Sequence, residues 1–296
     1  MTSSRIIKWG DLATLEYGKS LRDYRESKGK CRVFGTNGPI GWSDESLCST
    51  PTVIVGRKGA YRGIHFSFEP CFVIDTAFYL KPKVDFDMRW AYYQLLTQDI
   101  NGMDSGSAIP STSRDDFYQL SVNVPPLEQQ KKVARILSDL DAKIELNNKM
   151  NKTLETMAQA LFKKWFVDFE FPGYEKVKFI SGLPDGWRED ELTNICDILM
   201  GQSPPGETYN ESGDGVVFYQ GNRDFGFRFP TPRVYCTAPT RIAEDGDILI
   251  SVRAPVGALN IALERCAIGR GVAALRMKRY SNGFLYYFCL FEVLNG

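Results

Sequence analysis

Residue types that support catalysis are sparse in this chain. His65 is the one histidine, so a catalytic triad has a single candidate base and any site with two histidine ligands is excluded. No GxxxxGK[ST] loop, no GxGxxG after a strand and no [DNS]PP[YFW] motif occurs. Asp141-Ala142-Lys143 resembles the end of a nuclease motif, but it lies within a predicted helix, where we expect a surface ion-pair role. Glu244-Asp245-Gly246-Asp247 is expected to be a turn rather than a metal site. The sequence therefore predicts a chain that is not an enzyme by itself and has no catalytic or metal-binding residues.

Composition limits the function further. Lys and Arg number 36 and Asp and Glu also number 36, so no bulk basic charge indicates nucleic acid, although a local patch would suffice. No CxxC pair occurs and most cysteines have apolar neighbours, so we expect small buried side chains. The sequence has no apolar core of a signal peptide and no apolar run long enough to span a membrane. It therefore predicts a cytoplasmic protein without a membrane partner. The seven cysteines are Cys31, Cys48, Cys71, Cys196, Cys236, Cys266 and Cys289.

Two polar loops offer the chemistry of binding instead. Residues 56–63 (GRKGAYRG) follow a predicted strand, and residues 251–257 (SVRAPVG) occupy the matching place later in the chain. Glycine beside arginine and lysine lets the backbone approach a phosphate or base edge, and arginine can bind guanine through two hydrogen bonds. Each loop alone is typical of a solvated turn, but their recurrence favours a shared ligand surface. The candidate binding residues are Lys19, Ser20, Asn37, Arg57, Lys58, Tyr61, Arg62, Ser107, Arg114, Gln202, Ser203, Asn222, Arg223 and Arg253.

A long helix is predicted over residues 125–170. Apolar residues recur at alternating steps of four and three, the pattern of a coiled-coil seam, and such a stripe needs a second helix to cover it. Pro126 suits the first turn, and about 40 residues at ~1.5 Å each give a rod of roughly 60 Å. Asn147 and Asn151 interrupt the seam, either as weak packing or as a polar layer that fixes register. The predicted seam is Val133, Leu137, Leu140, Ile144, Asn147, Asn151, Leu154, Leu161 and Trp165.

The regions on either side of this helix resemble each other. Gly18-Lys19-Ser20 matches Gly201-Gln202-Ser203, and Trp9 opens the first region as Trp187 opens the second. From residue 53 onward, an offset of 195 superposes many positions without gaps. A shared register without gaps over about 40 residues indicates a duplicated domain, although the sequence identity between the two copies is low.

The duplication predicts an α+β fold with two related domains, each of mixed, curled sheets and short helices, joined by the long helix. The domains are expected at residues 1–124 and 187–296, with a linker at 171–186. Short apolar runs predict strands, including CFVIDTAFYL as one strand, and RWAYYQLL predicts a helix. With the offset of 195, Gly296 corresponds to Asn101, so we expect the second domain to be incomplete and a second long helix to be missing.

Two stretches carry a resemblance to a known family. Residues 125–169 (PPLEQQKKVARILSDLDAKIELNNKMNKTLETMAQALFKKWFVDF) resemble the central conserved helix of type I restriction–modification specificity subunits. Residues 106–130 (GSAIPSTSRDDFYQLSVNVPPLEQQ) are similar to the end of that family's target recognition domains. The resemblance implies two target recognition domains, each contacting one half of a bipartite double-stranded DNA sequence. A rod of roughly 60 Å would span about 18 base pairs at ~3.4 Å each.

The resemblance also implies partners. Methyltransferase subunits would dock on the coiled coil, hold S-adenosylmethionine and modify adenine, and restriction subunits would join through the complex. No cofactor is expected on this chain. Alternatively, two chains pair through the central helix as a dimer, or the product is a silent fragment. A coiled-coil scaffold that binds only protein explains the helix but not the matched polar loops. A solitary nuclease lacks a carboxylate–lysine cluster.

Overall fold

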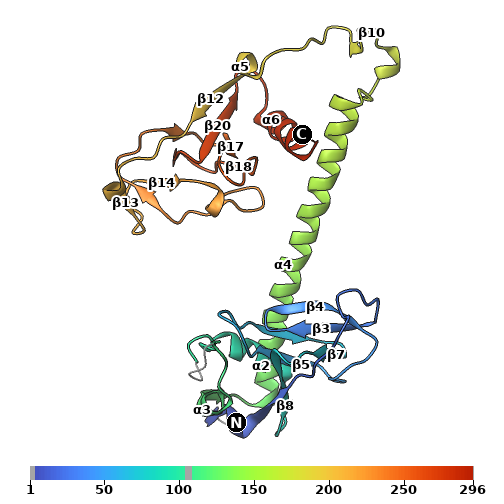
Figure 1. The fold of residues 1–296 in the computed structure, drawn as a ribbon, viewed down its shortest axis with the longest axis vertical. Coiled ribbons are helices and arrows are strands. Elements are labelled where there is room, and N and C mark those ends of the chain that lie inside the picture. The colour runs from blue at the N-terminus through green and yellow to red at the C-terminus, as the bar shows by residue number, and fades with distance from the viewer. Residues whose placement is uncertain (1–3, 104–108, 296) are drawn as a thin grey trace. The chain divides into compact units, whose positions relative to one another are not determined.

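A computed structural model of the chain describes residues 4–103 and 109–295. The chain divides into two compact units, Met1–Asn148 and Lys149–Gly296. One helix, α4 (Leu127–Phe162), begins in the first unit and ends in the second (Figure 1). Over the two described ranges, no helix is long and apolar enough to cross a membrane.

Helix α4 confirms the long helix that the heptad pattern predicted, with shorter ends. Its first turn begins after Pro126, whose carbonyl oxygen accepts hydrogen bonds from the backbone N–H groups of Gln129 and Gln130 at 2.8 and 3.1 Å. Pro126 has no N–H of its own, so its position costs no hydrogen bond. The helix continues as a π-helical turn, η1 (Lys163–Val167). It stops before Phe169, whose φ of 57° lies in the left-handed region.

Two main sheets build the first unit. One has four antiparallel strands, and the other has three, of which β3 and β7 are parallel. A third, two-stranded ladder pairs the two ends of the unit. The strands in sheet order are β2 (Ala13–Tyr17), β8 (Ala77–Pro82), β5 (Thr52–Gly56) and β6 (Ile64–Ser67); β4 (Gly38–Ser43), β3 (Cys31–Gly35) and β7 (Cys71–Val73); and β1 (Arg5–Lys8) with β9 (Ser121–Val124).

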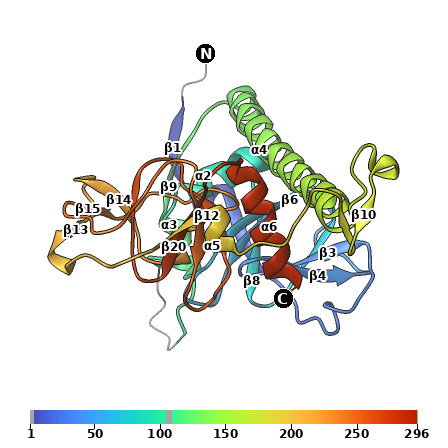
Figure 2. The same cartoon turned by 90° about the horizontal axis from the view of Figure 1, so that it is seen from above.

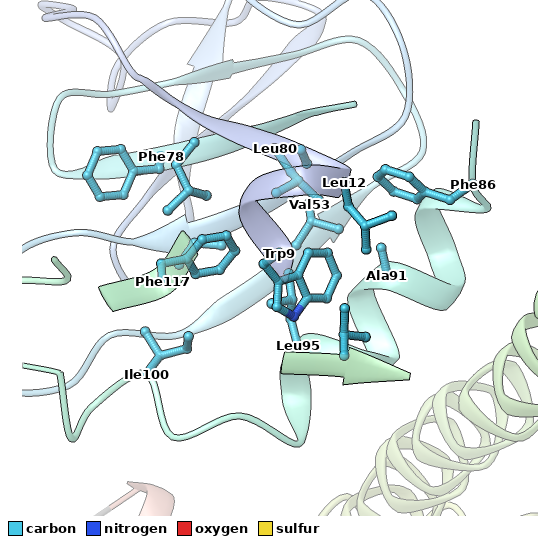
Figure 3. Close-up of a cluster of buried hydrophobic side chains, with 14 of the residues drawn as sticks. Trp9, Leu12, Val53, Phe78, Leu80, Phe86, Ala91, Leu95, Ile100 and Phe117 are labelled. Atoms are coloured by element: carbon cyan, nitrogen blue, oxygen red, sulfur yellow. The ribbon is translucent and has the colours of Figure 1, made fainter. Parts of the chain in front are cut away.

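Strand β5 is buried on both faces, which explains its unbroken apolar sequence. Val53 and Val55 point into the main core, whereas Ile54 points into a second cluster. This alternation follows from the two-residue period of a strand. In the main core the Trp9 ring packs against those of Trp90 and Phe117, with ring centroids 6.4 and 5.8 Å away. Figure 3 shows Trp9 and Phe117 in this core.

Three short helices cover this core: α1 (Trp9–Leu12), α2 (Met88–Leu96) and α3 (Arg114–Gln119). Helix α2 begins where the Asp87 side chain accepts a hydrogen bond from the backbone N–H of Trp90 at 2.8 Å. Helix α3 begins where Ser113 accepts one from Asp116 at 3.2 Å. Both residues are typical N-caps, and the helix predicted from RWAYYQLL is confirmed as α2.

The second unit repeats the four-stranded sheet and has a larger mixed sheet, whose strands β13 to β15 lie together in Figure 2. A short hairpin and a 3₁₀ turn, η2 (Tyr174–Lys176), occupy the predicted linker. The strands in sheet order are β12 (Cys196–Met200), β20 (Val272–Met277), β17 (Ile248–Ser251) and β18 (Leu259–Ile261); β13 (Tyr209–Asn210), β15 (Tyr235–Cys236), β14 (Val216–Tyr219), β19 (Cys266–Ile268) and β16 (Ile242–Ala243); and β10 (Phe179–Ile180) with β11 (Leu183–Pro184). The helical segments are α5 (Leu192–Ile195), η3 (Gly206–Thr208), η4 (Asn222–Asp224) and α6 (Asn282–Asn295).

Strand register shows the same duplication as the sequence. Ile54 pairs with Tyr79 in the first unit, and Leu249 pairs with Ala274 in the second, so both partners are displaced by 195 residues. His65 faces Ile54 across the next ladder, and its counterpart Asn260 faces Leu249. The offset of 195 therefore holds for hydrogen-bonded pairs as well as for residue types.

Two local predictions are wrong. The run CFVIDTAFYL forms two strands in different sheets, because the chain turns at residues 74–76, where Ala77 N donates to Ile74 O at 3.0 Å. Trp187 is not the counterpart of Trp9. Trp9 begins α1 and is fully buried, whereas the matching helix α5 begins at Leu192. Trp187 is 43% exposed and stacks on Phe171.

Helix α6 packs against the last turns of α4 within the second unit. Phe162 is buried there, and its ring lies 5.5 Å from that of Phe284 and 6.4 Å from that of Tyr287. Arg228 donates hydrogen bonds to the Glu155 carboxylate and to the Tyr287 hydroxyl. An aromatic cluster and a charged network therefore hold this part of α4 to the second unit.

Candidate nucleic-acid interface

In the second unit, three loops meet at one edge of the sheets. Strands β14 and β19 are parallel, so their carboxyl ends lie at the same edge, and the loop after β17 joins them. The Val252 N–H donates to Gly271 O and the Gly271 N–H donates to Gln220 O, both at 3.0 Å. Together the loops surround a shallow concavity of about 170 Å³. Its lining is Gln220, Gly221, Asn222, Arg253, Ala254, Arg270 and Gly271.

Close backbone approach explains the glycines of this region, which we call the second loop cluster (residues 201–203, 220–223, 252–257 and 269–271). A Cβ on Gly201 would lie 2.2 Å from Gly269 O, and one on Gly271 would lie 2.5 Å from Gln220 O. Such contacts are far shorter than van der Waals distance, so only glycine fits without a backbone shift. The cluster is thus fixed by packing of backbone against backbone.

The side chains of this cluster are basic and amide-bearing. Arg253, Arg270, Arg223 and Gln202 are exposed, and Asn222 is half-buried. Among the residues that the structure describes, neither the Arg253 nor the Arg270 guanidinium donates a hydrogen bond to another protein group. Other arginines of this unit are engaged, since Arg233 contacts Asp224 and Arg276 contacts Asp247 at 2.8 and 2.5 Å. Ser203 Oγ accepts a hydrogen bond from the Arg270 N–H at 3.2 Å.

The first unit has an equivalent region, the first loop cluster (residues 18–20, 35–37, 56–63 and 74–76). Lys19 N donates to Val73 O at 2.9 Å, as Gln202 N donates to Ile268 O at 3.0 Å in the second unit. Likewise, Arg57 N donates to Thr76 O at 2.9 Å, which matches the bond from Val252 to Gly271. Lys19, Ser20, Asn37 and Lys58 are exposed. The two clusters therefore share a backbone framework, as the recurrence of the polar loops predicted.

Two predicted arginines of the first unit flank one aromatic ring. The guanidinium of Arg57 lies 4.7 Å from the centroid of the Tyr17 ring, and that of Arg114 lies 4.8 Å from it. Arg57 also donates to Asp75 O at 2.9 Å. Tyr17 is half-exposed and Tyr61, on the loop, is 65% exposed. These contacts bring Arg57 and Arg114 together, although they lie far apart in the sequence.

Arg62 corrects the predicted interface. Its side chain is 2% exposed, and its guanidinium donates to the carbonyl oxygens of Gly59, Ile100, Asn101 and Met103 at 2.7–3.1 Å. The carbonyl groups compensate the buried charge and close the loop against residues 100–103. Arg62 is therefore a structural residue that no ligand can reach. Ser107, another predicted binding residue, lies outside the described residues.

Sequence reasoning missed three residues in or beside the clusters. Arg270 and Gln220 line the concavity of the second unit, and the Tyr17 ring contacts both Arg57 and Arg114 beside the first loop cluster. The repeat itself held the signal for Arg270. The offset of 195 places it opposite Asp75, in the turn that follows a strand in both units.

The motifs that suggested catalysis have structural explanations. Asp141 accepts a hydrogen bond from the Tyr93 hydroxyl at 2.6 Å, so its role is not the predicted ion pair. Asp247 caps a turn by accepting from Glu244 N at 2.8 Å, which confirms the turn before β17. Over residues 4–103 and 109–295, no group of three or more His, Cys, Asp or Glu is arranged to hold a metal ion.

His65 is half-buried, and most of the cysteines lie in the interior. The His65 ring lies against Gly38 and Gly63, and burial lowers its pKa below the usual value, while a backbone hydrogen bond with Thr36 opposes this shift. Six cysteines are buried and Cys31 is half-buried, so the prediction of buried side chains is confirmed for six. The hydrogen bond with Cys71, followed by burial, raises the pKa of Cys48.

Helix α4 presents an apolar stripe along its middle. The predicted seam residues Val133, Leu140, Ile144, Leu154 and Leu161 are exposed, as are Asn147 and Asn151, and Leu137 and Trp165 are half-buried. Ile136, Leu146, Met150 and Met157 are exposed as well. An exposed apolar surface of this length marks a binding surface rather than a solvated face. The heptad pattern therefore predicted which residues stay uncovered within this chain.

Comparison with known proteins defines the class of protein. A type I restriction–modification system S subunit from M. genitalium has the same fold, with a TM-score of 0.65 and 19% identity over 98% of this chain and 77% of that one. The putative type I restriction enzyme MjaX specificity subunit from Methanocaldococcus jannaschii is 40% identical over 184 residues. These residues cover 60% of this chain and 43% of that protein.

The family model agrees. Residues 4–156 match the type I restriction modification DNA specificity domain, so the chain belongs to this family. The type I restriction enzyme HindI specificity subunit from Haemophilus influenzae is 43% identical over 79 residues, or 27% of this chain and 16% of that protein. The matching residues thus span less than half of either curated relative.

Proposed function

We propose that this chain is the DNA sequence-specificity subunit of a type I restriction–modification complex and that it contacts a bipartite DNA target. The family match over residues 4–156 is the observation that supports this most strongly. The two loop clusters support it independently, because both expose basic and amide side chains on the same backbone framework. Two copies of one binding surface suit a target with two halves.

In this proposal each loop cluster contacts one half-site. Arginine and lysine bind phosphate oxygens and the acceptors of guanine, and asparagine and glutamine bind adenine. Arg57, Lys58, Arg114, Arg253 and Arg270 supply the first kind of group. Asn37, Asn222 and Gln202 supply the second. Helix α4 links the two clusters along the chain.

The chain itself is proposed to be non-catalytic. Its partners would be methyltransferase subunits docked on the apolar stripe of α4, and restriction subunits joined through them. S-adenosylmethionine would bind to the methyltransferase subunits, which modify adenine. The exposed residues Leu140, Ile144 and Leu154 are the surface that such docking would cover. A test is co-purification of the methyltransferase subunit with the full chain and with an Ile144→Asp variant, in which a charge at the stripe should abolish the complex.

DNA binding is tested first by its dependence on salt. Affinity of the full chain for duplex DNA should fall steeply between 50 and 200 mM salt, because each neutralised phosphate releases counterions. A coiled-coil scaffold that binds only protein would show no such binding. In cells, a genome-wide map of N6-methyladenine should lose one interrupted motif when this gene alone is deleted. An unchanged map would contradict a specificity role and favour a silent product.

A second copy of this chain is a further candidate for the apolar stripe of α4. Asn147 and Asn151 lie at the middle of the stripe, where polar side chains fix the register of paired helices. Light scattering of the purified full chain separates the cases. A dimer that dissociates in the Ile144→Asp variant supports pairing through α4, and a stable wild-type monomer contradicts it.

A further inference from the structure

The two loop clusters differ in charge at one equivalent position. Arg270 follows β19 in the second unit, and the offset of 195 places Asp75 at the same point after β7 in the first. Both residues are exposed and lie in the turn that leads into the next strand. The neighbouring basic position is retained, since Arg253 corresponds to Lys58. At these two equivalent positions the second unit thus carries two cations, whereas the first unit carries a cation and a carboxylate.

The lining of the concavity in the second loop cluster suits guanine. Guanine presents two acceptors, O6 and N7, on its major-groove edge, and arginine binds both through its planar fork of donors. Arg253 and Arg270 line the same concavity of about 170 Å³, together with the amides of Gln220 and Asn222. No carboxylate belongs to this lining. Cytosine presents an amino donor there, and the lining offers it no carboxylate as an acceptor.

The charge reversal argues against a phosphate contact at this position. A phosphate is the same whichever sequence is bound, so a phosphate-contacting position would need a basic or neutral residue in both units. Asp75 would repel a phosphate at the equivalent place, whereas a carboxylate accepts hydrogen bonds from the amino group of cytosine. A position that changes charge between two copies of one surface fits base selection.

We infer that Arg270 and Arg253 select guanine in the half-site bound by the second unit, and that Asp75 excludes guanine at the equivalent base of the other half-site. This inference rests on the proposed function and adds to it a base identity and a specificity-determining position. The backbone of the turn is held independently of the Arg270 side chain, by Gly271 N to Gln220 O and Val252 N to Gly271 O. Substitution of the side chain should therefore leave the loop in place.

Selection from a randomised duplex library with the full chain tests this inference. The wild-type chain should enrich an interrupted motif with a required guanine. Arg270→Asp, which installs the residue of the first unit, should lower the preference for that guanine about 5- to 150-fold while the rest of the motif persists. Arg279→Ala, a matched loss of an exposed arginine outside the concavity, should leave the motif unchanged. Asp75→Arg should add a guanine preference in the other half-site.

Two outcomes would overturn the inference alone. Retention of the guanine in both Arg270→Asp and Arg253→Ala would show that neither arginine selects it. An equal loss of affinity for all sequences, with a smaller salt dependence, would show phosphate contacts. Enrichment of no motif by the folded wild-type chain would instead overturn the proposed function together with the inference. Circular dichroism melting of each variant confirms that the chain is folded.

Discussion

The loops after β5 and β17 start from the same strand position and are closed by different means. In the first unit, the buried Arg62 guanidinium gathers four backbone carbonyl oxygens. The equivalent residue of the second unit is Gly257, with a φ of +92°, which leaves no side chain to perform this role. Ser251 closes that loop instead, donating to Pro255 O at 2.7 Å and accepting from Ala258 N at 2.9 Å. The register of the ladders therefore fixes where each loop begins, whereas the loop's own side chains fix its shape.

The largest effect is expected from a substitution that removes the closure by Arg62. Arg62→Ala should lower the free energy of unfolding by at least about 3 kcal/mol, because each hydrogen bond to a charged group contributes about 1.5–3 kcal/mol and the carbonyl groups would lose their partner. Urea denaturation of the full chain measures this loss. Lys58→Ala, an exposed residue of the same loop, should change stability by less than about 0.5 kcal/mol. Equal effects would contradict a structural role for Arg62.

Addition of a methyl group to a glycine tests the close backbone packing that both clusters share. Gly201→Ala should cost about 1–3 kcal/mol, because its Cβ would lie 2.2 Å from Gly269 O and the loops would have to separate. Gly206→Ala is the matched control in the same unit, since nothing lies within 4 Å of a Cβ there. The two unfolding free energies, measured in urea, should differ clearly. An unchanged unfolding free energy in Gly201→Ala would contradict tight packing of the cluster.

Removal of the second closure should have a smaller effect than loss of Arg62. Ser251 is buried, and Ser251→Ala removes two hydrogen bonds, so a loss of about 1–2 kcal/mol is expected. The same substitution should weaken DNA binding, since Arg253 stands on this loop. Ser49→Ala, at an exposed serine of the first unit, serves as the control for both measurements. Unchanged stability in Ser251→Ala would mean that the loop needs no such closure.

The smallest effect concerns pH and His65, whose counterpart in the second unit is Asn260. Burial lowers the pKa of His65, so the unfolded chain binds a proton more readily than the folded chain. Stability from this residue is therefore present above the unfolded pKa of about 6.5 and is lost as the pH falls through it. His65→Asn installs the residue of the second unit and should flatten the dependence between pH 7 and 5.5. Urea midpoints at each pH provide the measurement, and an unaltered slope would exclude His65 as its source.

Much of the fold was predictable because it depends on local periodicity and on the internal repeat. The seam from Val133 to Leu161 predicted α4, and the constant offset of 195 predicted two related domains. The equivalence of Trp9 and Trp187 was wrong because it relied on a residue type outside that register. The break in CFVIDTAFYL was missed since a buried turn at residues 74–76 leaves the apolar run intact.

The candidate site was predictable only in part, for a physical reason. Sequence pattern alone indicates that two polar loops recur after equivalent strands, and that α4 carries an apolar stripe that the rest of the chain does not cover. The inward direction of Arg62 depends on the folded chain, because three of its four carbonyl partners lie some 40 residues further along. The tertiary structure likewise places Arg270 beside Arg253, through a parallel pairing of β14 and β19 that no local pattern encodes. Periodicity specifies elements, whereas the direction of a loop side chain depends on what distant segment it meets.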